Sequence, residues 1–63
     1  MNELYRRLTG LLKTAGYALF RQGKGSHEIW CKNGKDCVTV PVTIKSRHLA
    51  NQILKDVKIK EKL

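Results

Sequence analysis

The dipeptide Asn33-Gly34 is the feature that most narrows the fold of this 63-residue chain. Asn-Gly between two apolar runs indicates a β-hairpin, because both central residues of a type I′ turn need a positive φ. The runs on either side, 27–32 and 37–41, are short and rich in β-branched and aromatic residues. We therefore predict two antiparallel strands joined at this turn.

The register of this hairpin decides where the two cysteines point. If the turn has two residues, Cys31 lies opposite Asp36, and Cys31 and Cys37 point to opposite faces of the sheet. That register argues against a disulfide, although a one-residue bulge at Lys35 or Asp36 would overturn it. Two cysteines make no disulfide framework, so we expect structural or incidental thiols. One predicted face carries His27 at its edge with Ile29, Cys31, Val38 and Val40, and the other carries Glu28, Trp30, Cys37 and Thr39.

Two segments with apolar residues at helical spacing, one before and one after the predicted strands, indicate two helices. Near the N-terminus Asn2 is a suitable N-cap, and Gly16 stands where a left-handed residue would end the helix. After the strands Ser46 caps a second helix, and the lysine-rich stretch 58–63 is expected to fray or to form an irregular tail. Apolar residues at helical spacing give each helix a face toward a core. They are Leu4, Leu8, Leu11, Leu12 and Ala15 in the first, and Leu49, Ala50, Ile53, Leu54 and Val57 in the second.

These elements predict a single domain over residues 1–63 in the order α-β-β-β-α. The segment 17–22 is aromatic-rich and too short for a helix after a glycine, so we predict that it is the first strand. The fold class is α+β, an antiparallel three-stranded sheet with both helices on one face. Double-stranded RNA-binding domains have this order and shape, and they engage RNA mainly through shape and phosphate contacts. A chain this short buries only about 60% of its unfolded surface, so an active site must lie on the surface.

The charge balance indicates the class of partner. Thirteen Lys and Arg residues against five Asp and Glu give a net charge of +8. This charge points to a polyanion, with nucleic acid first, while a merely soluble basic protein is the plainer alternative. No run approaches the ~20 apolar residues of a membrane span, and the N-terminus lacks a signal-peptide pattern. We expect a cytoplasmic protein with no membrane partner.

A glycine-flanked basic loop leads to His27, the first residue of the second predicted strand. Histidine ordinarily has a pKa of about 6.5, which suits it to take and give a proton near neutral pH. As general base, His27 would deprotonate a ribose 2′-hydroxyl, whose attack on the adjacent phosphate cleaves RNA without a metal. Arg21 and Lys24 are the nearest cations along the sequence, and the backbone N–H groups of Gly23 through Ser26, including Gly25, can point at a phosphate. The plainer reading is a strand-end histidine that hydrogen-bonds a neighbour, since one histidine fixes no catalytic geometry.

Other candidate residues have weaker support. His48, at the second position of the last helix, suits capping or solvent contact better than catalysis. Trp30 and Tyr17 could stack on bases or meet a protein partner, although aromatic residues on a small sheet more often pack. His27 and Cys31 lack the spaced partners of a zinc site, so we expect no metal and no cofactor.

Four segments of the chain, in the same order, resemble the HicA family of toxins. They are Gly16-Tyr17, the run 21–30, Val38-Thr39-Val40-Pro41 and the run 45–55. The resemblance implies a fold like that of double-stranded RNA-binding domains, and an mRNA interferase, an endoribonuclease that cleaves mRNA, stops translation and arrests growth. It also implies neutralisation by a HicB-type antitoxin, and it maps the family's catalytic histidine onto His27.

The chain departs from this family pattern at one place. Many relatives carry Pro-x-His directly after the third strand, whereas Pro41 is followed here by Val42, Thr43 and Ile44. No role is therefore carried over to a histidine in that loop. Two other functions stay open: an RNA-binding module without catalysis, and a subunit that mainly holds a transcription-repressing partner.

Overall fold

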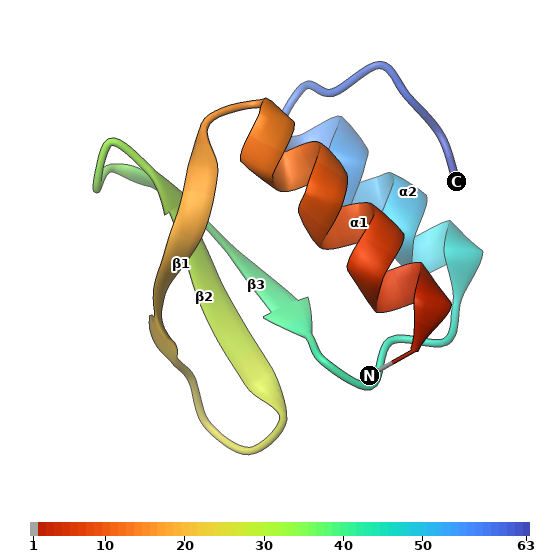
Figure 1. Ribbon diagram of the computed structural model, residues 1–63, viewed down its shortest axis with the longest axis horizontal. Helices are drawn as coiled ribbons and strands as arrows, with labels where there is room; N and C mark the ends of the chain where they lie inside the picture. The colour runs from red at the N-terminus through yellow and green to blue at the C-terminus, as the bar shows by residue number, and fades with distance from the viewer. Residues whose placement is uncertain (1) are drawn as a thin grey trace.

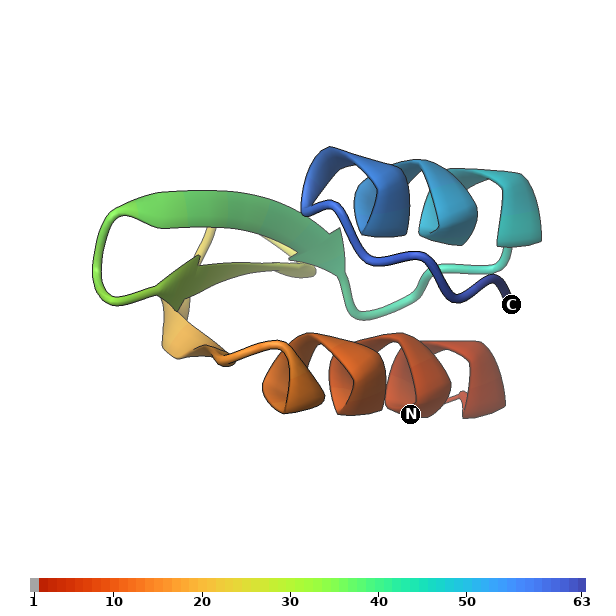
Figure 2. The same ribbon diagram turned by 90° about the horizontal axis from the view of Figure 1, so that it is seen from above.

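The computed structural model describes residues 2–63 as a three-stranded antiparallel sheet with two helices. Along the chain the elements are α1 (Glu3–Thr14), β1 (Tyr17–Gln22), β2 (His27–Lys32), β3 (Asp36–Pro41) and α2 (Arg47–Asp56). β2 is the central strand. Figure 1 and Figure 2 show both helices together on one side of the sheet, which confirms the predicted α-β-β-β-α fold. Neither helix has the length and apolar character needed to cross a bilayer.

Both helices begin at the predicted capping residues. The Asn2 Oδ1 atom accepts a hydrogen bond of 2.6 Å from the Tyr5 N–H, and its Nδ2 donates to the Ile44 carbonyl at 2.6 Å. The Ser46 Oγ atom accepts from the Leu49 N–H at 3.1 Å. Each cap satisfies a backbone donor that the helix itself cannot pair. Asn2 also ties the start of α1 to the segment that leads into α2.

The hairpin turn contains one residue more than predicted. Asn33 and Gly34 both have positive φ, 56° and 69°, and the Lys35 N–H donates to the Lys32 carbonyl at 3.1 Å. These are the features of a type I′ turn. However, Lys32 pairs with Asp36, so Lys35 is an additional loop residue. A shift of one residue moves every side chain of β3 to the other face of the sheet.

This shift overturns the predicted hairpin register and the prediction against a disulfide. Cys31 lies opposite Cys37 instead of Asp36, with their Cα atoms 4.0 Å apart, and a disulfide joins the two residues. The face of the sheet turned away from the helices is called the outer face here, and the helix-covered face is called the inner face. The outer face carries His27, Ile29, Cys31, Cys37 and Thr39, and the inner face carries Glu28, Trp30, Val38 and Val40.

The core lies between the inner face and the two helices. Burial of each large apolar side chain contributes about 1.5–3 kcal/mol, and the predicted stripes of the two helices supply half of the buried cluster. Leu49 is the exception: it is 42% exposed at the edge of the α2 stripe, because so small a core covers only a narrow part of the helix. The buried core cluster comprises Tyr5, Leu8, Leu12, Tyr17, Trp30, Val40, Ile44, Ala50, Ile53 and Leu54.

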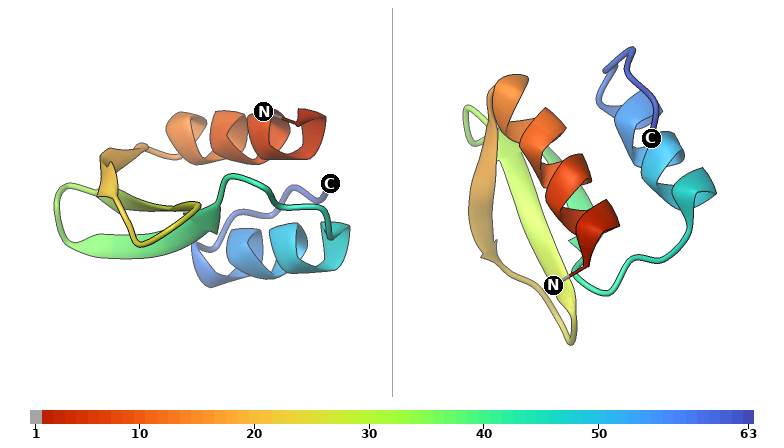
Figure 3. Two further views of the ribbon diagram at one scale, coloured as in Figure 1. Left: turned by 90° about the horizontal axis from the view of Figure 1, so that it is seen from below. Right: turned by 45° about the vertical axis from the view of Figure 1, so that its right-hand side comes forward.

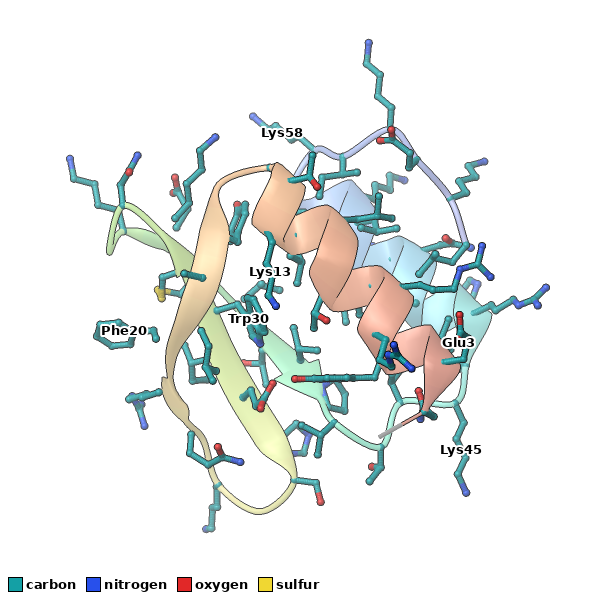
Figure 4. The ribbon with its side chains drawn as sticks, viewed as in Figure 1. Glu3, Lys13, Phe20, Trp30, Lys45 and Lys58 are labelled. Atoms are coloured by element: carbon teal, nitrogen blue, oxygen red, sulfur yellow. A yellow bond between two sulfur atoms is a disulfide. The ribbon has the colours of Figure 1, made fainter. Side chains whose placement is uncertain are left out.

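A buried carboxylate connects α1 to the central strand. Glu28 is only 6% exposed, and its Oε1 atom accepts from the Tyr5 hydroxyl at 2.5 Å and from the Trp30 Nε1–H at 3.1 Å. Figure 4 shows Lys13 reaching toward Trp30, with its Nζ 5.9 Å from the ring centroid. A buried charge is tolerated only when it is hydrogen-bonded, and these donors satisfy that requirement.

The end of α2 is closed by a Schellman motif without glycine. The Ile59 N–H donates to the Leu54 carbonyl at 2.8 Å, and the Lys58 N–H donates to the Lys55 carbonyl at 3.0 Å. Lys58 has φ of 62°, a conformation in which glycine is the usual residue. Figure 3 shows that the tail after this motif turns back beside α2. Leu63, at the end of this tail, exchanges hydrogen bonds with the Asn51 side chain, so the tail is bound to α2 and does not fray.

Replacement of Tyr5 by Phe should remove a pH-dependent part of the stability. Burial, the hydrogen bond to Glu28 and the charge of Glu28 raise the pKa of Tyr5 from 10.0 to about 12. The neutral phenol is therefore favoured in the folded protein. Its contribution to the free energy of unfolding is complete below about pH 10 and is lost as the pH rises toward 12.

Urea unfolding at a series of pH values measures this effect. Near neutral pH, Tyr5→Phe should cost about 1–3 kcal/mol, because Glu28 loses a donor. Between about pH 10 and 12, the stability of the wild type should fall more steeply than that of the variant. Parallel pH profiles over that interval would contradict the assigned hydrogen bond.

Replacement of Lys58 by Gly should stabilise the protein. Glycine adopts a positive φ without the steric cost of a side chain, so we expect a gain of about 1 kcal/mol in the free energy of unfolding. Lys60→Gly removes the same charge from a residue without positive φ, and it should give no gain. Chemical denaturation compares the two, and equal stabilities would show that the backbone of Lys58 is not strained.

Candidate active site

His27 lies on the outer face because of the alternation along β2. Glu28 and Trp30 point inward and are buried, so His27 and Ile29 point outward. The His27 side chain is exposed at the first position of the strand. The sequence thus brings the predicted histidine to a solvent-accessible face that no helix covers.

A tight turn of residues 23–27 holds the backbone of His27. The Gly23 N–H donates to the His27 carbonyl at 2.7 Å, and the His27 N–H donates to the Lys24 carbonyl at 3.3 Å. Gly25 has φ of 64°, at the first central position of this turn, where a type II′ turn requires glycine. A Cβ atom on Gly23 would lie 3.1 Å from the His27 carbonyl oxygen. Both glycines therefore serve the placement of the histidine.

The same turn orients the imidazole ring. The His27 Nδ1 atom lies 3.2 Å from the Lys24 carbonyl oxygen. A carbonyl can only accept a hydrogen bond, so this contact is a hydrogen bond when Nδ1 carries the proton. In that neutral tautomer the Nε2 atom is left with a lone pair that can accept a proton. The arrangement suits a general base in which Nε2 accepts the proton while the hydrogen bond from Nδ1 to the backbone orients the ring.

A β-bulge in β1 brings Arg21 to the face of His27. Leu19 pairs with Trp30 and Arg21 pairs with Ile29, so Phe20 is an extra residue between them. Without the bulge, Arg21 would follow Leu19 on the inner face. With it, Arg21 lies beside Ile29 on the outer face, diagonal to His27 across neighbouring strands. Such diagonal pairs have Cα atoms about 7–8 Å apart, within reach of a long side chain.

The predicted phosphate-binding loop is only partly available to a ligand. The Gly23 N–H already bonds within the turn, whereas those of Lys24, Gly25 and Ser26 donate to no other group in residues 2–63. The Ser26 carbonyl accepts from the Val42 N–H at 2.8 Å, which fixes the loop to the segment after β3. Lys24, Gly25 and Ser26 are all exposed. The structure therefore places Arg21 on the face of His27, and Lys24, Gly25 and Ser26 in the turn before it. The Arg21 guanidinium itself donates to the Gln22 carbonyl at 3.5 Å.

The two aromatic residues considered as base-stacking or partner contacts pack in the core instead. Trp30 and Tyr17 are 3% and 8% exposed and belong to the core, so neither can stack on a base or meet a partner. Phe20 is instead 62% exposed, and Figure 4 shows it projecting from the edge of the sheet. The aromatic-rich run 17–22 hinted at such a residue. Its place at the bulge was not visible in the sequence.

The remaining candidates lie away from this site. His48 is exposed on α2, in the helical layer. Within residues 2–63, His, Cys, Asp and Glu side chains form no group of three or more that could hold a metal ion. The absence of a metal and of a cofactor from the reaction stays a prediction.

Comparison with known proteins gives the family of the chain. No curated protein and no solved structure matches it. The model of a family described as HicA toxin of bacterial toxin-antitoxin matches residues 5–59. That range includes the whole of the turn, the bulge and the outer face described above. On this evidence, the chain belongs to the HicA family of bacterial toxins.

Proposed function

We propose that this protein is a metal-independent endoribonuclease that cleaves mRNA, with His27 as its general base. The observation that carries the proposal is the exposed ring with its Nδ1 atom 3.2 Å from a backbone carbonyl. When Nδ1 carries the proton and donates to that carbonyl, Nε2 can accept a proton. Membership of a toxin family and the net charge of +8 support an RNA substrate.

The reaction uses a nucleophile that RNA itself supplies. The Nε2 atom of His27 takes the proton of a ribose 2′-hydroxyl, and the 2′-oxygen attacks the adjacent phosphorus. The bond between phosphorus and the 5′-oxygen breaks, which leaves a 2′,3′-cyclic phosphate and a 5′-oxygen that takes a proton from water. The hydroxide formed in this way takes the proton from the His27 imidazolium, which restores the neutral base. Proton transfer by a positioned side chain contributes typically about 10²–10⁴-fold to the rate.

We expect two cations to stabilise the phosphate as negative charge develops on it. Arg21 lies on the outer face diagonal to His27, and Lys24 belongs to the turn that orients the ring. Their charges, with the N–H groups of Gly25 and Ser26, would favour the transition state over the ground state. Arg21 owes this position to the β-bulge, a feature that often re-aims side chains next to active sites.

The biological role that we propose follows from the family. We propose that mRNA cleavage by this protein stops translation and arrests growth, and that a HicB-type antitoxin neutralises it by binding the protein. RNA and this antitoxin are the two partners that we propose. The exposed Phe20 at the sheet edge is a suitable residue for an antitoxin contact, because aromatic residues are enriched at interface hot spots.

Replacement of His27 by Ala should reduce RNA cleavage by about 10²–10⁴-fold and abolish growth arrest, because the base is removed. The measurement is incubation of purified protein with RNA in the presence of a chelator. Thr43→Ala is the control, since it removes an exposed polar side chain from the segment after β3, beyond the register pair of His27 and Pro41, and it should cleave like the wild type.

Two outcomes would contradict this proposal. A folded His27→Ala protein that cleaves RNA at the rate of the wild type would exclude the role of His27. Salt-dependent RNA binding with no cleavage product, the same in wild type and His27→Ala, would instead identify a non-catalytic RNA-binding module.

A further inference from the structure

A second basic feature lies on the helical side of the molecule, in a groove between α2 and the returning tail. The groove has a volume of about 610 Å³. One wall is formed by one side of α2, where the half-buried Asn51 lies among the exposed residues His48, Gln52 and Lys55. The other wall is the tail, residues 58–62. None of the residues assigned to the candidate active site lines this groove.

The tail is fixed in place at both of its ends. At its start, the Ile59 N–H bonds to the Leu54 carbonyl, and the Ile59 side chain packs against the core. At its end, the Asn51 Oδ1 atom accepts from the Leu63 N–H at 2.7 Å and the Asn51 Nδ2 donates to the Leu63 carbonyl at 3.3 Å. The groove is therefore a built feature of the fold, and a ligand would not have to order the tail.

The walls of the groove carry a strong positive charge. Lys55, Lys58, Lys60 and Lys62 are all exposed, and Glu61 is the single acidic residue in the lining. Figure 4 shows Lys58 where α2 passes into the tail. Each ammonium group is a compact point charge on a flexible stem, suited to a phosphate but not to the recognition of a particular base.

We propose that this groove binds the phosphodiester backbone of RNA, away from the point of cleavage. The inference rests on the proposed RNA substrate. A nucleic acid fits better than a protein partner, because lysine is depleted at protein interfaces, whereas nucleic-acid interfaces are much more positively charged. The Cα trace measures 28 × 26 × 15 Å. At about 3.4 Å per nucleotide, an RNA of about 10–15 nucleotides can span the groove and the outer face together.

The test compares two variants of equal charge. The groove variant is Lys55→Gln with Lys60→Gln and Lys62→Gln, and Lys58 is kept because its backbone has a positive φ. The control variant changes three exposed lysines outside the groove: Lys32→Gln, Lys35→Gln and Lys45→Gln. Thermal unfolding checks that both variants fold. The probe is a fluorescent 2′-O-methyl RNA, whose blocked 2′-oxygen prevents cleavage, and anisotropy measures its dissociation constant at several salt concentrations.

The groove variant should lose about two units of the slope of log K against log salt, since each single-strand phosphate contact contributes about 0.7. At about 0.1 M salt this corresponds to about 100-fold weaker binding, while the control should change much less. Equal losses in the two variants would overturn the proposal, because binding would then follow net charge alone.

The same experiment separates this proposal from that of the proposed function. If wild-type protein fails to cleave unmodified RNA but the groove variant still loses binding, the result supports RNA binding in the groove and contradicts the endoribonuclease activity. If cleavage depends on His27 but the groove variant binds RNA like the control variant, the result supports the endoribonuclease activity and contradicts RNA binding in the groove.

Discussion

The buried carboxylate of Glu28 is the constraint on which the rest of the structure depends. Its hydrogen bonds to Tyr5 and Trp30 join α1 to the central strand, and they require this part of β2 to keep one face toward the helices. Because side chains alternate along a strand, the neighbour His27 must then point away from the core. An unpaired carboxylate in this position would be costly, so the fold resists any register of β2 that turns Glu28 outward and the histidine inward.

Two local departures from regular β structure complete the surroundings of the histidine. The positive φ of Gly25 closes the turn in which the Lys24 carbonyl faces the imidazole, and the extra residue Phe20 in β1 turns Arg21 to the outer face. The turn lies between two strands and the bulge lies in the edge strand β1, where bulges are over-represented. The site is thus assembled from backbone geometry as much as from side chains.

The sequence was sufficient for the element order and both helix caps, since these follow from local patterns. The place of His27 on the uncovered face was not predicted, because the predicted register put it on the same face as Val38 and Val40. The sequence was insufficient where the outcome depends on one residue more or less in a loop or strand. The turn at Asn33-Gly34 was predicted, but its third residue Lys35 was not, and that residue alone brings Cys31 opposite Cys37. The bulge at Phe20 is of the same kind, because strand pairing decides it and a local pattern does not.

The small size of the chain explains why the core and the proposed active site lie on opposite sides of the sheet. A core of ten buried residues needs the whole inner face and both helices, so no interior is left for a cavity that encloses a substrate. The outer face can therefore carry the histidine and its cations at little cost to packing. A substrate bound there remains in contact with water on one side, and electrostatic attraction from the many lysines and arginines must then contribute much of the binding energy.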